Sequence, residues 1–247
     1  MENELTIRLS AFLVLFLLFA LLESYWPRRK RVYSRLSRWP THWAITAINA
    51  LILRALSFGL PLLAVGAALD ASQSGLGLFN HLNWPIWVEF TICVLVLDFS
   101  IWVQHLITHK VPVLWRLHRV HHSDEDMDVT TAIRFHPVEI ALSMFLKIGL
   151  VYLIGPAALA VIVFEVLLNG TAMFNHANIS IPKPIDAVLR KVIVTPDMHR
   201  IHHSKIRLEH DSNYGFALSI WDRIFGTYTN VPQEGHEKMN VGLEWQD

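Results

Sequence analysis

Histidines in the second half of the chain recur at spacings that suit the binding of metal ions. The chain has fourteen histidines but a single cysteine. Eight of these histidines form one H-x-x-x-H and two H-x-x-H-H motifs: His105, His109, His118, His121, His122, His199, His202 and His203. On a helix, side chains three or four residues apart lie on one face, so each motif can direct its imidazoles toward one point. Neutral imidazole is a good ligand for zinc, iron, copper and nickel.

The two H-x-x-H-H motifs are nearly the same hexapeptide. Residues 118–123 and 199–204 differ only where Val120 stands in one and Ile201 in the other. Eight imidazoles exceed the four that a tetrahedral zinc site needs. Two ions, each bound by several imidazoles and each with open coordination positions, fit eight histidines better. Two nearly identical motifs also suit a site for two metals. The competing interpretation, three surface helices that are merely rich in histidine, does not explain the repeat.

The remaining histidines fall into two classes. His176 lies where a long apolar run gives way to polar sequence, and we count it as a candidate ninth ligand. His136 precedes Pro137, which favours a helix cap or a contact to a ligand over direct ligation, although ligation stays open. The other four lie outside the motifs and are expected to be ordinary: His42, His81, His210 and His236. The acids at 124–126 are expected to cap or solvate a loop.

Asp98 is the acid expected to support the ligands. It lies seven residues before His105, inside an apolar run. A carboxylate within a membrane span is usually functional. We therefore expect Asp98 to accept the outer N–H of an imidazole and fix its orientation, without binding metal itself. The alternative is an ion pair with Arg54.

Apolar runs predict several membrane helices. The chain is 53% hydrophobic, and only 17% of its residues are charged, below the roughly 25% of a soluble domain. Crossing a bilayer takes about 20 apolar residues, and four runs qualify: 5–25, 42–69, 84–106 and 138–173. Gly155-Pro156 breaks the last run, which predicts a helical hairpin that either spans twice or re-enters.

Positive charge indicates the orientation. Six cations follow the first run: Arg28, Arg29, Lys30, Arg31, Arg35 and Arg38. By the positive-inside rule this segment is cytoplasmic and the chain starts outside. Residues 107–137 and 174–247 are then cytoplasmic, so all three motifs lie on one side of the membrane.

These observations predict an all-α fold, with residues 1–247 forming one integral membrane domain. A multi-pass helical bundle is expected to carry a cytoplasmic helical cap, and that cap to hold the histidine-rich two-metal site.

The three motifs, in this order among apolar spans, resemble those of the fatty-acid hydroxylase and sterol desaturase superfamily. The similar stretch runs from about Asp98 to Tyr228 and includes Asp98-Phe99, the segment 211–215 and the segment 221–228. The tail is similar to that of alkylglycerol monooxygenase and its bacterial relatives. The resemblance implies two non-haem iron ions, with zinc as a substitute, together with dioxygen and a lipid substrate of the fatty acyl, sterol or ether type.

Two positions depart from the family pattern. Leu106 stands where an arginine often follows the first histidine. Fatty-acid 2-hydroxylases carry a further histidine pair before the last motif, whereas here only His176 is present and Ser180 stands four residues later. These departures weaken an assignment to that subgroup.

Composition and motifs also bear on partners and on competing functions. A net charge of zero argues against a nucleic-acid partner. No G-x-G-x-x-G joins a strand to a helix, so electrons are expected from a partner protein or a diffusible donor such as a pterin. A zinc-dependent membrane hydrolase would need an H-E-x-x-H motif, which is missing. A non-enzymatic metal carrier or haem protein would place its histidines inside spans. Hydroxylation and desaturation both stay open.

Overall fold

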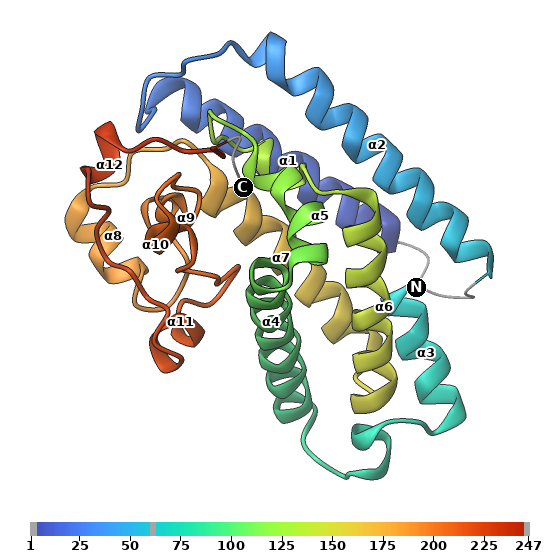
Figure 1. Ribbon diagram of the computed structural model, residues 1–247. Coiled ribbons are helices and arrows are strands. Elements are labelled where there is room, and N and C mark those ends of the chain that lie inside the picture. The colour runs from blue at the N-terminus through green and yellow to red at the C-terminus, as the bar shows by residue number, and fades with distance from the viewer. Residues whose placement is uncertain (1–3, 60–62, 245–247) are drawn as a thin grey trace.

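Helices make up the regular structure of the computed structural model, which describes residues 4–59 and 63–244 (Figure 1). The long helices are α1 Glu4–Tyr25, α2 Arg35–Gly59, α3 Ala64–Ser74, α4 Ile86–Lys110, α5 Pro112–His122, α6 Pro137–Ile154 and α7 Ala158–His176. The tail adds short helices: α8 Lys183–Leu189, α9 Pro196–His202, α10 Arg207–His210, α11 Ile220–Ile224 and α12 Gly235–Lys238. Two 3-10 turns, η1 Leu78–His81 and η2 Thr131–Ile133, complete the elements. The prediction of an all-α fold is confirmed over the described residues, where β-pairing is limited to isolated bridges.

Four helices are long and apolar enough to cross a membrane: α1, α4, α6 and α7. The prediction of an integral membrane protein is thereby supported. α4 extends past the predicted end at 106 to Lys110, so His105 and His109 lie on one helix. The two halves of the last apolar run are separate helices, α6 and α7, as the hairpin prediction requires.

The turn between α6 and α7 depends on Gly155. Its φ is +63°, a conformation that glycine adopts without steric cost. A Cβ added there would stand 2.6 Å from both the Asn80 side chain and the Leu76 carbonyl oxygen. Pro156 follows and cannot continue the helix hydrogen bonding. The hairpin is therefore sharp and packs against the η1 turn.

The prediction of one membrane helix over 42–69 is wrong. The stretch forms the end of α2 and the start of α3, with residues 60–62 outside the described ranges. Neither helix is among the candidate spans of the described chain. α2 begins earlier, at Arg35, and its polar side chains bond to the segment before α6. Thr46 Oγ1 donates to the Ile133 carbonyl at 3.2 Å, and Asn49 Nδ2 donates to the Phe135 carbonyl at 3.0 Å.

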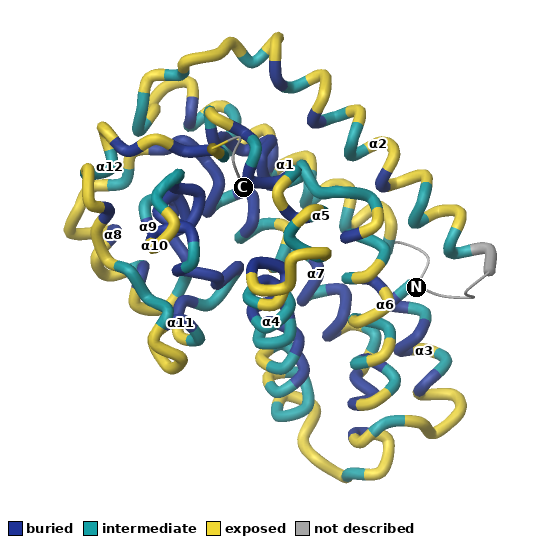
Figure 2. Tube along the Cα trace, in the orientation of Figure 1, coloured by how far each residue is buried: buried dark blue, intermediate teal, exposed yellow. Residues whose placement is uncertain are grey.

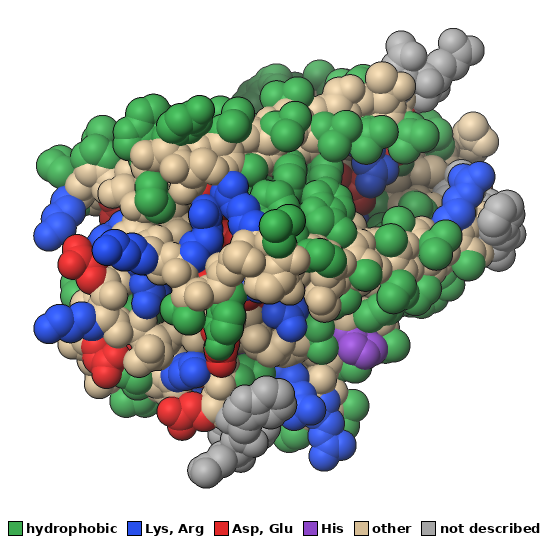
Figure 3. All heavy atoms as spheres, turned by 90° about the horizontal axis from the view of Figure 1, so that it is seen from above, with side chains coloured by type: hydrophobic (Ala, Val, Ile, Leu, Met, Phe, Trp, Pro, Cys, Tyr) green, Lys and Arg blue, Asp and Glu red, His purple; other side chains and the backbone are tan. Residues whose placement is uncertain are grey.

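The tail packs against the ends of α4 and α7 (Figure 1). Figure 2 shows dark blue, buried chain concentrated at this junction, whereas exposed, intermediate and buried residues alternate along α2. Glu23, at the end of α1, helps to join the parts because its Oε1 accepts from the amides of Val129 and Asn178, at 2.7 and 2.8 Å. Figure 3 shows hydrophobic side chains along one edge of the upper face and many charged ones toward the tail.

Candidate metal centre

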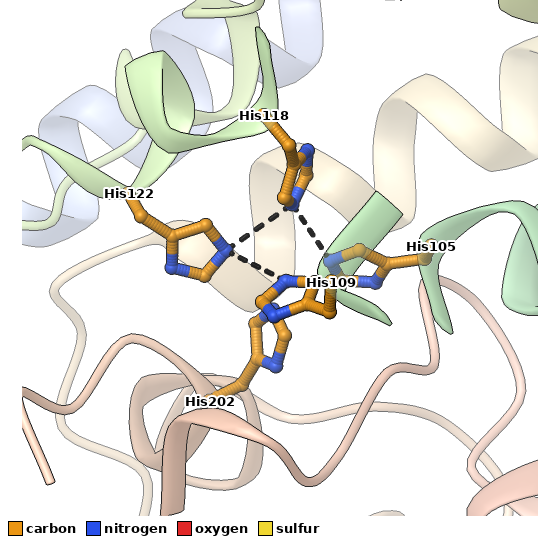
Figure 4. A group of neighbouring side chains, drawn as sticks. All are labelled: His105, His109, His118, His122 and His202. Atoms are coloured by element: carbon orange, nitrogen blue, oxygen red, sulfur yellow. Dashed lines mark hydrogen bonds between the residues drawn. The ribbon is translucent and has the colours of Figure 1, made fainter. Parts of the chain in front are cut away.

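Five buried imidazoles meet where α4, α5 and α9 converge, and we call them the first group (Figure 4). The members are His105, His109, His118, His122 and His202. Each offers one ring nitrogen, and these nitrogens all lie within 4.8 Å of one another. The Nε2 atoms of His105 and His118 are 3.1 Å apart, and those of His118 and His122 are 3.2 Å apart.

Four more buried imidazoles form a second group beside the first: His121, His176, His199 and His203. The Nε2 atom of His176 lies 3.0 Å from that of His121 and 3.2 Å from that of His199. The His122 and His203 rings stack across the two groups with centroids 4.4 Å apart. All nine histidines proposed from sequence as ligands are therefore brought together, including His176 from α7.

Each H-x-x-H-H motif is divided between the two groups. About 100° separates successive helical residues, so positions four apart differ by about 40° and the position three on lies about 60° to the other side. His118 and His122 therefore face the first group while His121 faces the second. In the other motif the assignment is reversed, because His199 and His203 face the second group and His202 faces the first. The expectation that one motif directs all its imidazoles at a single point is corrected.

The ring nitrogens fit two metal ions. Two ligands held about 2.0–2.1 Å from one ion at right angles have nitrogens about 3 Å apart, close to the observed spacing. Burial holds the pKa of five of the rings outside the spans well below the ordinary value: His121, His122, His199, His202 and His203. Neutral rings offer a free lone pair. His202 Nε2 and both nitrogens of His203 are buried without a hydrogen-bond partner, and a metal ion would satisfy such atoms.

Three of the first-group rings are oriented by fixed acceptors. His105 Nδ1 donates to the Tyr214 carbonyl and His202 Nδ1 to the Ser212 carbonyl, each at 2.7 Å. His118 Nδ1 donates to Glu139 Oε1 at 2.6 Å. A donating Nδ1 leaves Nε2 unprotonated and directed at the group.

Glu139 is the orienting carboxylate that sequence reasoning missed. It is buried in the first turn of α6, four residues before Ser143. The sequence did contain a sign of this role. Glu139 lies near the start of an apolar run, and the reasoning that made the Asp98 carboxylate a functional candidate within a membrane span applies to it equally.

Asp98 has a different role from the predicted one. Its Oδ2 accepts from the Trp221 indole at 2.8 Å and from the Leu218 amide at 3.3 Å. These are tail groups, not imidazoles. Asp98 lies two helical turns before His105, so α4 directs it at α11 rather than at the histidines. The expected contact to an imidazole is therefore corrected, and Asp98 anchors the tail to α4.

Asp222 is a buried tail carboxylate that fixes the loop beside His105. It accepts from the Trp102 indole and from the amides of Tyr214 and Gly215, at 3.0, 2.8 and 2.9 Å. These bonds hold the loop whose Tyr214 carbonyl orients His105. A Cβ on Gly215 would stand 2.9 Å from an Asp222 oxygen, so only glycine lets the two segments approach this closely.

His136 lies outside both groups and caps α6. Its Nδ1 accepts from the Val138 amide at 3.1 Å. A helix cap is one of the two roles that the sequence favoured for His136. The structure does not place its ring in either histidine group.

Three residues that were expected to be unremarkable are buried: His210, Asp124 and His42. The His210 ring stands 4.5 Å from that of His122, although it is not among the nine. Asp124, expected to cap or solvate a loop, is buried and bonded to Arg38 at 2.9 Å. His42 and Asp128 join the same cluster, and Arg38 supplies its positive charge.

A cavity of about 340 Å³, which we call the chamber, opens beside the first group. His105 and His118 line it together with Glu139, Phe135 and Phe216. No member of the second group is among the described residues that line it. A small molecule in the chamber would therefore contact the first group and not the second.

The sequence profile of the fatty acid hydroxylase family matches residues 90–227, more than half of the chain, and the chain belongs to this family. The matched range contains all nine grouped histidines, and the resemblance noted from the motifs is confirmed.

Individual relatives of known function are similar to this chain over part of their length. The chain is 26% identical to ornithine lipid hydroxylase OlsE of Rhizobium tropici over 204 residues, 81% of this chain and 59% of that protein. It is 33% identical to alkylglycerol monooxygenase of Homo sapiens over 170 residues, 67% of this chain and 35% of that protein. The Xenopus tropicalis alkylglycerol monooxygenase is 34% identical over 164 residues, 65% of this chain and 33% of that protein. The matches thus span between a third and three fifths of these relatives. No solved structure matches the chain.

Proposed function

We propose that the protein is a membrane-bound, dioxygen-dependent lipid hydroxylase with two iron ions, one in each histidine group. The observation that carries the proposal is the pair of buried imidazole groups beside a chamber within a bundle of apolar helices. Family membership and the names of the relatives, which are hydroxylases and monooxygenases of lipids, favour hydroxylation over desaturation.

The bound irons would supply the activation of dioxygen for attack on a C–H bond. In the overall balance one oxygen atom enters the C–H bond and the other leaves as water, with two electrons and two protons from an external donor. The chain's own residues hold neutral imidazoles in place and exclude water from the two groups. Glu139 and the Tyr214 carbonyl keep Nδ1 of His118 and His105 protonated, so that both Nε2 atoms remain free.

We further propose that the site faces the cytoplasm. The basic segment after α1 supports this, because it bonds to the histidine-bearing tail. Arg28 pairs with Asp197 at 3.2 Å, and Arg29 donates to the Met239 carbonyl at 2.6 Å. The positive-inside rule assigns such a segment to the cytoplasmic side. A reporter fused after Asp247 that works only on the outer side would contradict this orientation.

Metal analysis combined with isotope labelling tests the function. Purified protein is expected to contain two irons per chain, and cells that express it under ¹⁸O₂ are expected to accumulate lipid carrying one ¹⁸O atom. The His202→Ala variant should lose the labelled product, whereas His81→Ala, at an exposed histidine outside the groups, should not. One or two zinc ions with no labelled product would favour a zinc-dependent membrane hydrolase instead.

A further inference from the structure

Three charged side chains meet in the wall of the chamber, inside candidate membrane spans. Glu165 of α7 lies 2.8 Å from Lys147 Nζ of α6 and 2.9 Å from an Arg8 nitrogen of α1. The Glu165 and Lys147 side chains are only 4% and 11% exposed. Ionisable groups at such depth are costly, and they usually mark a functional site. The mechanism proposed above does not use them.

The charged cluster and the histidines lie at separate ends of the chamber. Glu139, Ser143 and Lys147 all line it, at four-residue intervals along one face of α6. Eight residues from Glu139 to Lys147 correspond to about 12 Å along the helix. Near His105 and His118 the wall includes the rings of Phe135 and Phe216, and the Glu139 carboxylate there is bonded to His118. The chamber therefore has its cationic side chains about 12 Å along α6 from Glu139, the carboxylate that bonds to His118.

Hydrogen-bond donors outnumber acceptors in the cluster. Lys147 has three N–H groups and Arg8 has five. Glu165 Oε1 accepts a hydrogen bond from Lys147 at 2.8 Å, and Oε2 lies within ion-pair distance of Arg8, at 2.9 Å. Two cations and one carboxylate carry a net charge of +1 (2 − 1 = +1). Glu4 also pairs with Arg8, at 3.0 Å, and counting it brings the four groups to a net charge of zero (2 − 2 = 0). The Arg8 and Glu4 side chains are 31% and 27% exposed, so water screens this outer pair more than the pair of Lys147 and Glu165. The remaining donors suit an oxygen-rich anion.

We propose that Lys147, Arg8 and Glu165 bind the anionic head of an amphiphilic substrate, a carboxylate or a phosphate, whose hydrocarbon chain extends toward the histidines. The inference rests on the proposed lipid hydroxylation and adds the charge of the substrate, its direction in the chamber and the distance between its head and the oxidised carbon. Glu165 holds the two cations in place and competes with the bound anion.

Binding of three amphiphiles of equal chain length tests the assignment. The metal-loaded protein in detergent is titrated with radiolabelled tetradecanoate, tetradecyl phosphate and tetradecanol. Both anions are expected to bind more tightly than the alcohol, and the tighter of the two identifies the head group. Lys147→Gln should weaken anion binding by about tenfold or more, as expected for the loss of a charge-assisted bond, and leave tetradecanol binding unchanged.

A second variant separates ligand binding from a purely structural ion pair. Glu165→Gln should tighten anion binding, because the competing carboxylate is removed, whereas a structural role predicts that both variants lower stability without changing the preference for anions. Lys183→Gln, at an exposed position on α8 outside the chamber, removes the same charge and should have no effect. Metal content verifies that each variant is folded.

The outcomes separate this inference from the proposed function. Equal binding of all three amphiphiles, or an anion-to-alcohol ratio that neither variant changes, overturns the charged docking site even if the protein oxygenates lipids. Selective anion binding that Lys147→Gln weakens and Glu165→Gln strengthens supports it even if no oxygenated product forms.

Discussion

The two histidine groups lie side by side but are held in different ways. In the first group, three of the five rings donate Nδ1 to fixed acceptors, namely Tyr214, Glu139 and Ser212, while Nδ1 of His109 and of His122 is buried without a hydrogen-bond partner. In the second, His176 donates to the Ala172 carbonyl, whereas the Nδ1 atoms of His121, His199 and His203 are buried without a partner. Only the first group reaches the chamber. The group that would face the substrate is therefore the one whose rings are most firmly oriented, as expected where geometry controls the reaction.

Adjacent ligands of one motif offer the sharpest test of two separate sites. His121→Ala and His122→Ala remove neighbouring residues that face different groups. Each variant should retain one of two metals and lose nearly all activity, because a buried site with a missing imidazole binds its ion poorly. Metal content and product formation are measured, with His81→Ala as the control. Loss of both metals in both variants would show that the nine histidines act as one site.

Glu139→Gln tests whether orientation matters in the first group. The amide cannot accept from His118 Nδ1 with the strength of a carboxylate. Loss of such an outer partner typically lowers activity or metal affinity by about 10- to 100-fold. We expect this decrease in product formation with most of the metal retained, and no change for Glu234→Gln at an exposed position. Full activity in the Glu139 variant would show that the hydrogen bond from His118 to Glu139 is not needed to orient the first group for the reaction.

Asp98→Asn separates attachment of the tail from metal binding. The asparagine oxygen still accepts a hydrogen bond from Trp221, but without the carboxylate charge. We expect the free energy of unfolding to fall by about 1 kcal/mol, seen as a lower melting temperature in detergent. Activity per bound metal should stay close to that of the parent protein. A variant that loses metal without losing thermal stability would instead implicate Asp98 in the histidine groups.

His136→Ala should have the smallest effect. The change removes a helix cap from α6, which costs about 0.5–2 kcal/mol for strong capping residues. Because histidine is not a preferred cap, we expect the melting temperature to decrease only slightly and metal content to be unaffected. A decrease in bound metal would mean that His136 contributes to the first group despite its position at the helix start.

Local patterns predicted much of this protein. The spacing of the motif histidines depends on neighbouring residues alone, and so do the apolar runs and the Gly155-Pro156 break. These patterns were enough to predict helices, a hairpin and candidate ligands. His176 was a weaker candidate because a lone histidine has no spacing to argue from.

Contacts between segments far apart in the sequence determined how the imidazoles are grouped and which residues orient them. The 5:4 division of the imidazoles depends on how α9, which packs against α7, places its rings beside those of α5. Helical spacing sets which side chains share a face but not what that face meets. Glu139 reaches His118 across 21 residues, and Asp98 meets Trp221 across 123. Hydrophobicity alone did not separate α2 from α3, and it gave no sign that Thr46 and Asn49 bond to the segment before α6. Side-chain identity and spacing thus determined the candidate ligands, whereas their partners followed from packing over long sequence separations.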